Sequence, residues 1–369
     1  MFQNVCVGGV DETGRDAVNE LSYLILQASI DVQLYQPSLS VRYNMAKNPN
    51  SFLRKVVELI SLGTGFPAFH NDEVGIRMML NKGVPLKEAW DWNPCGCVET
   101  NLSGRMRQYT ALADINLGSI VELTLNDGVN RKSGEKISVN TGNPAEFESF
   151  EDFMKALKAH LAHTIHATVV GSHLLDEICL ERPVPALSLT FKECIENGTD
   201  YSAGGAKYNV GNGIIMIGVA DLINSIASVR KLVYEDKSVN MKELCDALAA
   251  DFQGFEHVQE LCLNAPKYGN DEKEVDNIAA DIFTYIADEI EQYESKFGQM
   301  TPGILPVSGN TPFGLQVGAL PSGRKAWKPL ADGVSPSGGT DLGGPTAVLK
   351  SVSHIPHDRF NQGDRKSVV

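Results

Sequence analysis

Long amphipathic helical patterns alternate with short apolar runs over most of this chain. Apolar residues recur every three or four positions, the spacing that gives a helix one apolar face. The helical patterns cover residues 11–30, 50–62, 72–81, 86–90, 119–126, 147–179, 220–235, 241–252 and 274–297. Between two of them, residues 39–43 alternate like a strand. Long helices separated by short strands indicate an α/β fold, and we expect a barrel rather than an open sheet.

Four segments rich in Gly, Pro and polar residues interrupt this pattern. They are residues 65–71, 93–100, 199–213 and 301–344. Such residues favour turns over helices and strands, so we expect loops in these segments. Residues 93–100 also contain Cys95 and Cys97, the one closely spaced cysteine pair of the chain.

The overall composition excludes several classes of protein. The formal net charge is −14, whereas a general nucleic-acid binder needs a basic surface. No apolar run approaches the ~20 residues that span a bilayer, and residues 1–14 lack the basic and apolar regions of a signal peptide. The seven cysteines are odd in number and scattered, which does not indicate a disulfide framework. We therefore expect a cytoplasmic protein in a reducing compartment, with no nucleic acid and no membrane as partner.

The loop at residues 93–100 contains the residues best suited to chemistry. Cys97 and Glu99 are two positions apart, so in an extended loop their side chains point to one pocket. A neighbouring carboxylate disfavours thiolate formation, and no histidine lies nearby in sequence to act as a base. A neutral thiol that exchanges a hydrogen atom, next to a carboxylate that transfers a proton, suits the pair better than a cysteine-protease role. The alternative is a structural role, because free cysteines are often simply buried.

Other candidate sites are less specific. Cys95 and Cys97 lack the second ligand pair usual for zinc. His160, His163 and His166 recur every three residues, but no carboxylate or cysteine set joins them, so we expect a helix face and no metal site. The Gly-rich segment 204–205 lacks the Lys and Ser/Thr of a phosphate-binding loop.

Several blocks, in order along the chain, resemble the glycyl radical enzymes. The string GCVE at residues 96–99 resembles their cysteine loop, in the decarboxylase and dehydratase branch rather than pyruvate formate-lyase proper, which has two adjacent cysteines. The other blocks are GGVD (8–11) with GRDAVNEL (14–21), GFP (65–67) with NDE (71–73), GGAKYN (204–209), KLVYE (231–235), GALPSGRKA (318–326) with PLADG (329–333), and GPTAV (344–348). The resemblance covers nearly the whole chain up to Gln362.

The resemblance implies a fold and a mechanism. The fold would be part of a ten-stranded α/β barrel surrounded by long helices. A partner activating enzyme, which uses an iron–sulfur cluster and S-adenosylmethionine, would place a radical on a C-terminal glycine in an RVxGY-like motif. The radical would pass to Cys97, with Glu99 as acid/base partner, in a closed site that protects it from quenching. Some relatives use a carboxylate near residue 235, so Glu235 is a candidate substrate contact; the alternative is a solvated helix-end carboxylate.

The ends of the chain suggest a fragment. We expect residues 1–362 to be the second part of the barrel domain, and no RVxGY motif occurs in the sequence. Residues 364–369 read DRKSVV, which a widely used sequencing adapter encodes in one frame, so we expect residues 363–369 to be a non-native tail. The glycine radical domain would then be absent, no cofactor would be bound, and the fragment alone would be inactive.

The sequence is compatible with three functions. The string CGCVET at residues 95–100 slightly favours decarboxylation of an arylacetate such as 4-hydroxyphenylacetate. The second is dehydration or elimination from a diol, hydroxyproline or choline-like substrate, in which Cys97 abstracts a hydrogen atom and Glu99 deprotonates the neighbouring hydroxyl. The third is a non-catalytic fragment. A homodimer, and for a decarboxylase a small additional subunit, are the partners that the resemblance implies.

Overall fold

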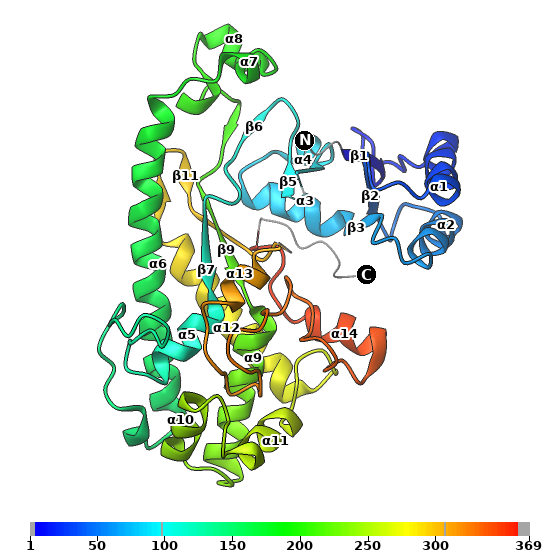
Figure 1. The fold of residues 1–369 in the computed structure, drawn as a ribbon. Coiled ribbons are helices and arrows are strands. Elements are labelled where there is room, and N and C mark those ends of the chain that lie inside the picture. The colour runs from blue at the N-terminus through cyan, green and yellow to red at the C-terminus, as the bar shows by residue number, and fades with distance from the viewer. Residues whose placement is uncertain (1–3, 97–98, 306–307, 361–369) are drawn as a thin grey trace.

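A computed structural model describes residues 4–96, 99–305 and 308–360 of the chain (Figure 1). One lobe contains the N-terminal strands and the first two helices. A long helix runs along the opposite side of the molecule, and helix α3 (Asp72–Asn81) lies between them (Figure 1). Because the structure describes neither residues 97–98 nor residues beyond 360, Cys97 and the predicted tail at 363–369 lie outside the described residues.

The N-terminal lobe is a parallel sheet with crossover helices. Its strands β1 (Asn4–Gly8), β2 (Ser38–Tyr43) and β3 (Ala68–Asn71) lie in the order β1-β2-β3. Helices α1 (Glu20–Val32) and α2 (Asn50–Ile60) connect successive strands, as parallel pairing requires. Leu26, Val41 and Phe52 are fully buried in the core between sheet and helices.

Two sequence predictions in this lobe are wrong. The first helix begins at Glu20, not at residue 11, because Asn19 caps it and the Asp11 side chain instead accepts the backbone N–H groups of Thr13 and Arg15 in a turn. The expected loop at 65–71 contains β3, which pairs with β2. With only four residues, this strand is too short to show a clear alternation.

A second parallel sheet forms the centre of the larger lobe. Strands β7 (Ala113–Asn116), β9 (Gly213–Ile217) and β12 (Thr301–Gly303) lie in the order β12-β9-β7. All five residues of β9 are buried. Helices α5 (Leu117–Thr124), α6 (Phe150–Leu180), α9 (Val219–Val229) and α12 (Lys273–Glu291) pack around this sheet. The expected α/β class is thus confirmed, with parallel strands buried under helices.

The connecting region between the lobes contains short elements. Helices α3 (Asp72–Asn81) and α4 (Leu86–Ala89) lead to the antiparallel pair β4 (Asn93–Cys95) and β5 (Glu99–Asn101). Strand β6 (Met106–Arg107) then pairs with β8 (Tyr208–Asn209), which comes a hundred residues later. The expected loop at 93–100 is therefore a hairpin.

The remaining elements are mostly short. They are η1 (Pro144–Glu146), α7 (Pro185–Ser188), α8 (Lys192–Asn197), η2 (Tyr201–Ala203), the π-helical η3 (Arg230–Glu235), α10 (Met241–Ala249), α11 (Glu256–Asn264), β10 (Glu294–Ser295), β11 (Gly298–Gln299), α13 (Asn310–Gly314) and α14 (Gly344–Val352). The expected helix at 274–297 ends early, at Glu291, because the β10–β11 hairpin follows.

The loop before α6 is fastened to that helix by a buried histidine. Each ring nitrogen of His160 contacts a hydroxyl: Nδ1 lies 2.7 Å from Ser138 Oγ, and Nε2 lies 3.0 Å from Thr141 Oγ1. The pKa of His160 is lowered to about 4, mainly by burial; the charge of Asp127 opposes this shift, and His163 and Lys136 add to it. His160 is therefore a neutral structural residue at neutral pH.

The depressed pKa of His160 predicts acid destabilisation. The unfolded chain binds a proton near pH 6.5 and the folded chain only near pH 4, so this contribution to stability is present above pH 6.5 and is lost as the pH falls toward 4. When the pH falls from 7 to 4.5, the unfolding free energy of each protein decreases. We expect this decrease to be about 2 kcal/mol smaller for His160→Gln than for the unchanged chain. His257→Gln, at an exposed position, is the control. Equal losses in all three proteins, measured by urea unfolding, would contradict this account.

Two helix-interior glycines predict opposite responses to alanine. A Cβ at Gly75 in α3 would lie 2.2 Å from the buried ring of Trp92, whereas a Cβ at Gly171 in α6 would meet nothing within 4 Å. We expect Gly75→Ala to destabilise the fold by about 1–3 kcal/mol through overpacking. Gly171→Ala should stabilise it by up to about 1 kcal/mol through helix propensity. Urea unfolding of both variants measures the difference, and equal responses would show that Trp92 moves aside freely.

Candidate active site

The cysteine-bearing segment is a tight antiparallel hairpin. Asn93 pairs with Asn101, Pro94 with Thr100, and Cys95 with Glu99. Gly96 follows β4 with φ of +57°, a conformation that favours glycine. A Cβ at Gly96 would also lie only 2.9 Å from Glu99 Oε2. The backbone conformation thus favours glycine there, and a larger residue would also displace the Glu99 carboxylate.

Glu99 is held at the start of β5 with defined partners. Its side chain is half-buried, and its Oε1 accepts a hydrogen bond from Thr110 Oγ1 at 3.4 Å. Directly after β4, the carbonyl of Gly96 accepts a hydrogen bond of 2.9 Å from Asn4 Nδ2 in β1. The hairpin is therefore tied to the N-terminal sheet on one side and to the loop before β7 on the other.

Cys95 is the described thiol of this segment. It is exposed and stands directly opposite Glu99 in the hairpin. Loss of hydration around the sulfur raises the pKa of Cys95, and the Glu99 carboxylate raises it further. At neutral pH the described thiol next to Glu99 is therefore protonated, which suits a hydrogen-atom donor and not a thiolate nucleophile.

A lysine that sequence reasoning missed supports β5 from the opposite side. Lys82 Nζ donates to the carbonyl oxygen of Thr100 at 3.4 Å, to Thr100 Oγ1 at 3.3 Å and to Gln108 Oε1 at 3.1 Å. Gln108 Nε2 also donates to the Thr100 carbonyl oxygen, at 2.6 Å. Burial lowers the pKa of Lys82 to about 7. No sequence motif marks Lys82 or Thr110, because each meets the hairpin only through the fold.

The structure places Glu235 in different surroundings from Glu99. Glu235 ends η3, where it pairs with Arg230 Nε at 2.8 Å and Lys231 Nζ at 3.9 Å. It lines a small hollow with residues of α9, η3 and α12. None of these neighbours belongs to the 93–116 segment, so the described residues do not bring the two predicted carboxylates together.

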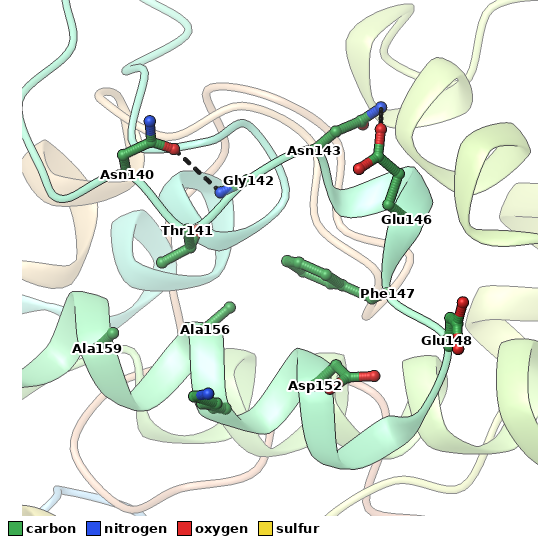
Figure 2. A pocket seen from close by; sticks show the side chains of 11 residues that line it. Asn140, Thr141, Gly142, Asn143, Glu146, Phe147, Glu148, Asp152, Ala156 and Ala159 are labelled. Carbon is green, nitrogen blue, oxygen red and sulfur yellow. Dashed lines mark hydrogen bonds between the residues drawn. The ribbon is translucent and has the colours of Figure 1, made fainter.

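A separate hollow of about 640 Å³ lies against the first turns of α6 (Figure 2). Thr141 and Asn143 line one side of it, and Phe147, Asp152 and Ala156 line the other. None of its lining residues comes from the hairpin or from the loop that contains Thr110. The hollow is thus distinct from the site around Glu99.

The described part of the chain shows two further negative findings. No group of three or more His, Cys, Asp or Glu side chains is arranged to hold a metal ion there. Over the same residues, no helix combines the length and the apolar character needed to cross a membrane.

The chain is similar to known proteins over nearly all of its length. The model of the pyruvate formate lyase-like family matches residues 1–314. The trans-4-hydroxy-L-proline dehydratase of Clostridioides difficile is 35% identical over 376 residues, covering 100% of this chain and 47% of that protein. The glycyl radical subunit of the 4-hydroxyphenylacetate decarboxylase of Clostridium scatologenes is 27% identical, covering 96% of this chain and 44% of that protein.

A solved structure agrees with the sequence comparisons. The glycerol-bound B12-independent glycerol dehydratase from Clostridium butyricum superimposes with a TM-score of 0.92 at 40% identity, over 98% of this chain and 46% of that one. The described strands and helices are thus part of the α/β barrel that the sequence resemblance implied. The chain spans about half the length of the curated relatives that it matches. On the family match and this fold, the chain belongs to the pyruvate formate lyase-like family, that of the glycyl radical enzymes.

Proposed function

We propose that this chain supplies the cysteine hairpin of a glycyl radical lyase that eliminates a leaving group from a small hydroxylated substrate. The supporting observation is the placement of Glu99, which is half-buried, stands opposite Cys95 and accepts a hydrogen bond from Thr110. A carboxylate so placed can accept a proton from a substrate hydroxyl next to the cysteine turn.

The two site residues have separate tasks in this proposal. Cys97, as a thiyl radical, abstracts a hydrogen atom from a substrate carbon and so becomes a thiol. Glu99 accepts the proton of the neighbouring hydroxyl and becomes a carboxylic acid. The carbon–oxygen bond on the adjacent carbon then breaks, and the departing hydroxide takes the proton from Glu99 and leaves as water. The product radical takes the hydrogen atom back from the Cys97 thiol, which restores the thiyl radical. Thr110 orients the carboxylate through its hydrogen bond to Oε1. Both site residues belong to the GCVE string at residues 96–99 of the sequence.

The comparisons support elimination rather than decarboxylation. The glycerol and hydroxyproline dehydratases are 40% and 35% identical to this chain, whereas the arylacetate decarboxylase subunit is 27% identical. The slight preference for an arylacetate that CGCVET suggested is therefore not retained as the main proposal. A diol or hydroxyproline-like substrate takes its place, and a non-catalytic role remains the competing hypothesis.

The proposed reaction needs a radical source and a partner enzyme. The radical would come from a glycine of the whole protein, generated by an S-adenosylmethionine-dependent iron–sulfur activating enzyme. A homodimer would be the working form. Glu235, which is paired with Arg230 and Lys231, is a weaker candidate for substrate contact than Glu99.

Turnover of defined substrates tests the proposal. The longer protein that contains this chain would be prepared without oxygen, together with its activating enzyme. It would then be offered glycerol, 1,2-propanediol, trans-4-hydroxyproline and 4-hydroxyphenylacetate. We expect a dehydrated product from one of the first three and no carbon dioxide from the fourth. Carbon dioxide release would support the decarboxylase instead, and a protein that carries the radical but turns over none of the four would contradict the proposed substrate class.

Substitution of the carboxylate tests its role in proton transfer. We expect Glu99→Gln to lower turnover about 100- to 10,000-fold, the usual contribution of a positioned acid/base group. The glycyl radical signal in electron paramagnetic resonance should remain, because the amide keeps the shape of the hairpin. Glu235→Gln tests the second candidate carboxylate in the same assay, and we expect a much smaller decrease in turnover, because Glu235 already pairs with Arg230 and Lys231. The reverse ranking of the two variants would transfer the acid/base role to Glu235.

A further inference from the structure

A single buried arginine joins three segments at the root of the cysteine hairpin. Arg42 lies in β2 and is 6% exposed. Its Nε donates to Asp72 Oδ1 at 2.7 Å, at the start of α3. Its Nη2 donates to the carbonyl oxygen of Trp90 and its Nη1 to that of Trp92, each at 2.7 Å. Trp90 and Trp92 directly precede β4, which begins at Asn93.

Asp72 connects the same arginine to the side chain of Trp92. Its carboxylate is fully buried and accepts Trp92 Nε1 at 2.9 Å and Asn44 Nδ2 at 3.1 Å. The Arg42 guanidinium also lies 4.9 Å from the centre of the Trp92 ring. Both the backbone and the indole of Trp92 are therefore fixed by one buried ion pair, which we call the Arg42–Asp72 clamp.

Two glycines make room for the clamp. A Cβ at Gly9 would lie 2.7 Å from Arg42 Nε, and a Cβ at Gly75 would lie 2.2 Å from the Trp92 ring. Side chains at these positions would push the guanidinium or the indole out of place. The backbone at Gly9 and Gly75 thus leaves the space that the guanidinium and the indole occupy.

The chemistry of the clamp depends on a guanidinium. Two backbone carbonyls and one carboxylate receive three of its N–H groups, in directions that a planar fork supplies at once. A lysine ammonium is a point donor on a flexible stem and cannot occupy all three positions from the same backbone. Removing one of these partners leaves buried charge without compensation.

We propose that Arg42 and Asp72 are positioning residues that fix the root of the cysteine hairpin, and with it the place of Glu99 relative to the rest of the fold. The clamp touches neither Glu99 nor Cys95, so its effect is exerted through Trp90 and Trp92. The contacts described above support the claim that the clamp positions the hairpin. The claim that this positioning affects catalysis rests on the proposed function.

Hydrogen exchange in this chain tests the structural part. With Arg42→Lys, we expect amide exchange in peptides covering residues 90–101 to become about tenfold faster or more, as the loss of a charge-assisted hydrogen bond would allow. Exchange in α6 serves as the internal reference and should not change. Arg359→Lys is the matched control, since Arg359 bridges Asp288 and Glu291 and no described contact joins it to the hairpin. Unchanged exchange at 90–101, or an equal increase in α6, would overturn the proposal.

A milder variant keeps the test decisive if Arg42→Lys does not fold. Asn44→Ala removes one donor to Asp72 and leaves Arg42 in place. It should accelerate exchange at 90–101 by a smaller factor, again without a change in α6. If exchange at 90–101 does not become faster, or becomes faster in α6 as well, the result contradicts the proposed role of the clamp.

Turnover in the longer protein tests the catalytic consequence separately. Arg42→Lys should lower kcat more than it changes KM, with the glycyl radical signal retained, because substrate binding groups stay in place while the hairpin does not. If Arg42→Lys changes the exchange pattern but the longer protein has no lyase activity, the positioning role of the clamp is supported and the proposed function is refuted. If the longer protein is active and Arg42→Lys leaves its kcat unchanged, the effect of the clamp on catalysis is refuted.

Discussion

The buried ion pair between Arg42 and Asp72 is the interaction on which the arrangement of the site depends. It joins β2 of the N-terminal sheet to the start of α3 and to the residues before β4. A buried charge pair is stable only when its remaining hydrogen-bonding positions are satisfied, and here two carbonyls, an indole and an amide satisfy them. The N-terminal lobe and the cysteine hairpin are thus held in one relative position.

Beyond the clamp, the hairpin is supported on each side by different parts of the chain. Asn4 binds the Gly96 carbonyl from β1, Thr110 binds Glu99 from the loop before β7, and Lys82 binds Thr100 from the end of α3. These three supports restrict Glu99 to one region between the lobes. A fixed carboxylate next to a protonated thiol is the arrangement that hydrogen-atom and proton transfer both require.

The sequence predicted long periodic elements better than short ones. The helices at 50–62, 72–81 and 147–179 were predicted within a few residues of α2, α3 and α6, because several turns display their apolar face. The short strands β3, β6 and β7 and the helix α11 were not predicted. Strands this short show too few periods of alternation, and β6 is defined only by a partner a hundred residues away. The strand pairing of 93–101 was missed for the same reason. Length does not explain the missed helix α11, because α10 also has nine residues and was predicted.

The sequence by itself determined the α/β class and, through the GCVE string and the other ordered blocks, the family, because these depend on local periodicity and on motifs read in order. Only the tertiary structure decided that Cys95 faces Glu99, that Lys82 and Thr110 support the hairpin, and that Arg42 reaches Trp90 and Trp92. Each of these contacts joins residues whose separation in the chain bears no fixed relation to their distance in space. Packing and the burial of charge select such contacts, and no local pattern records them.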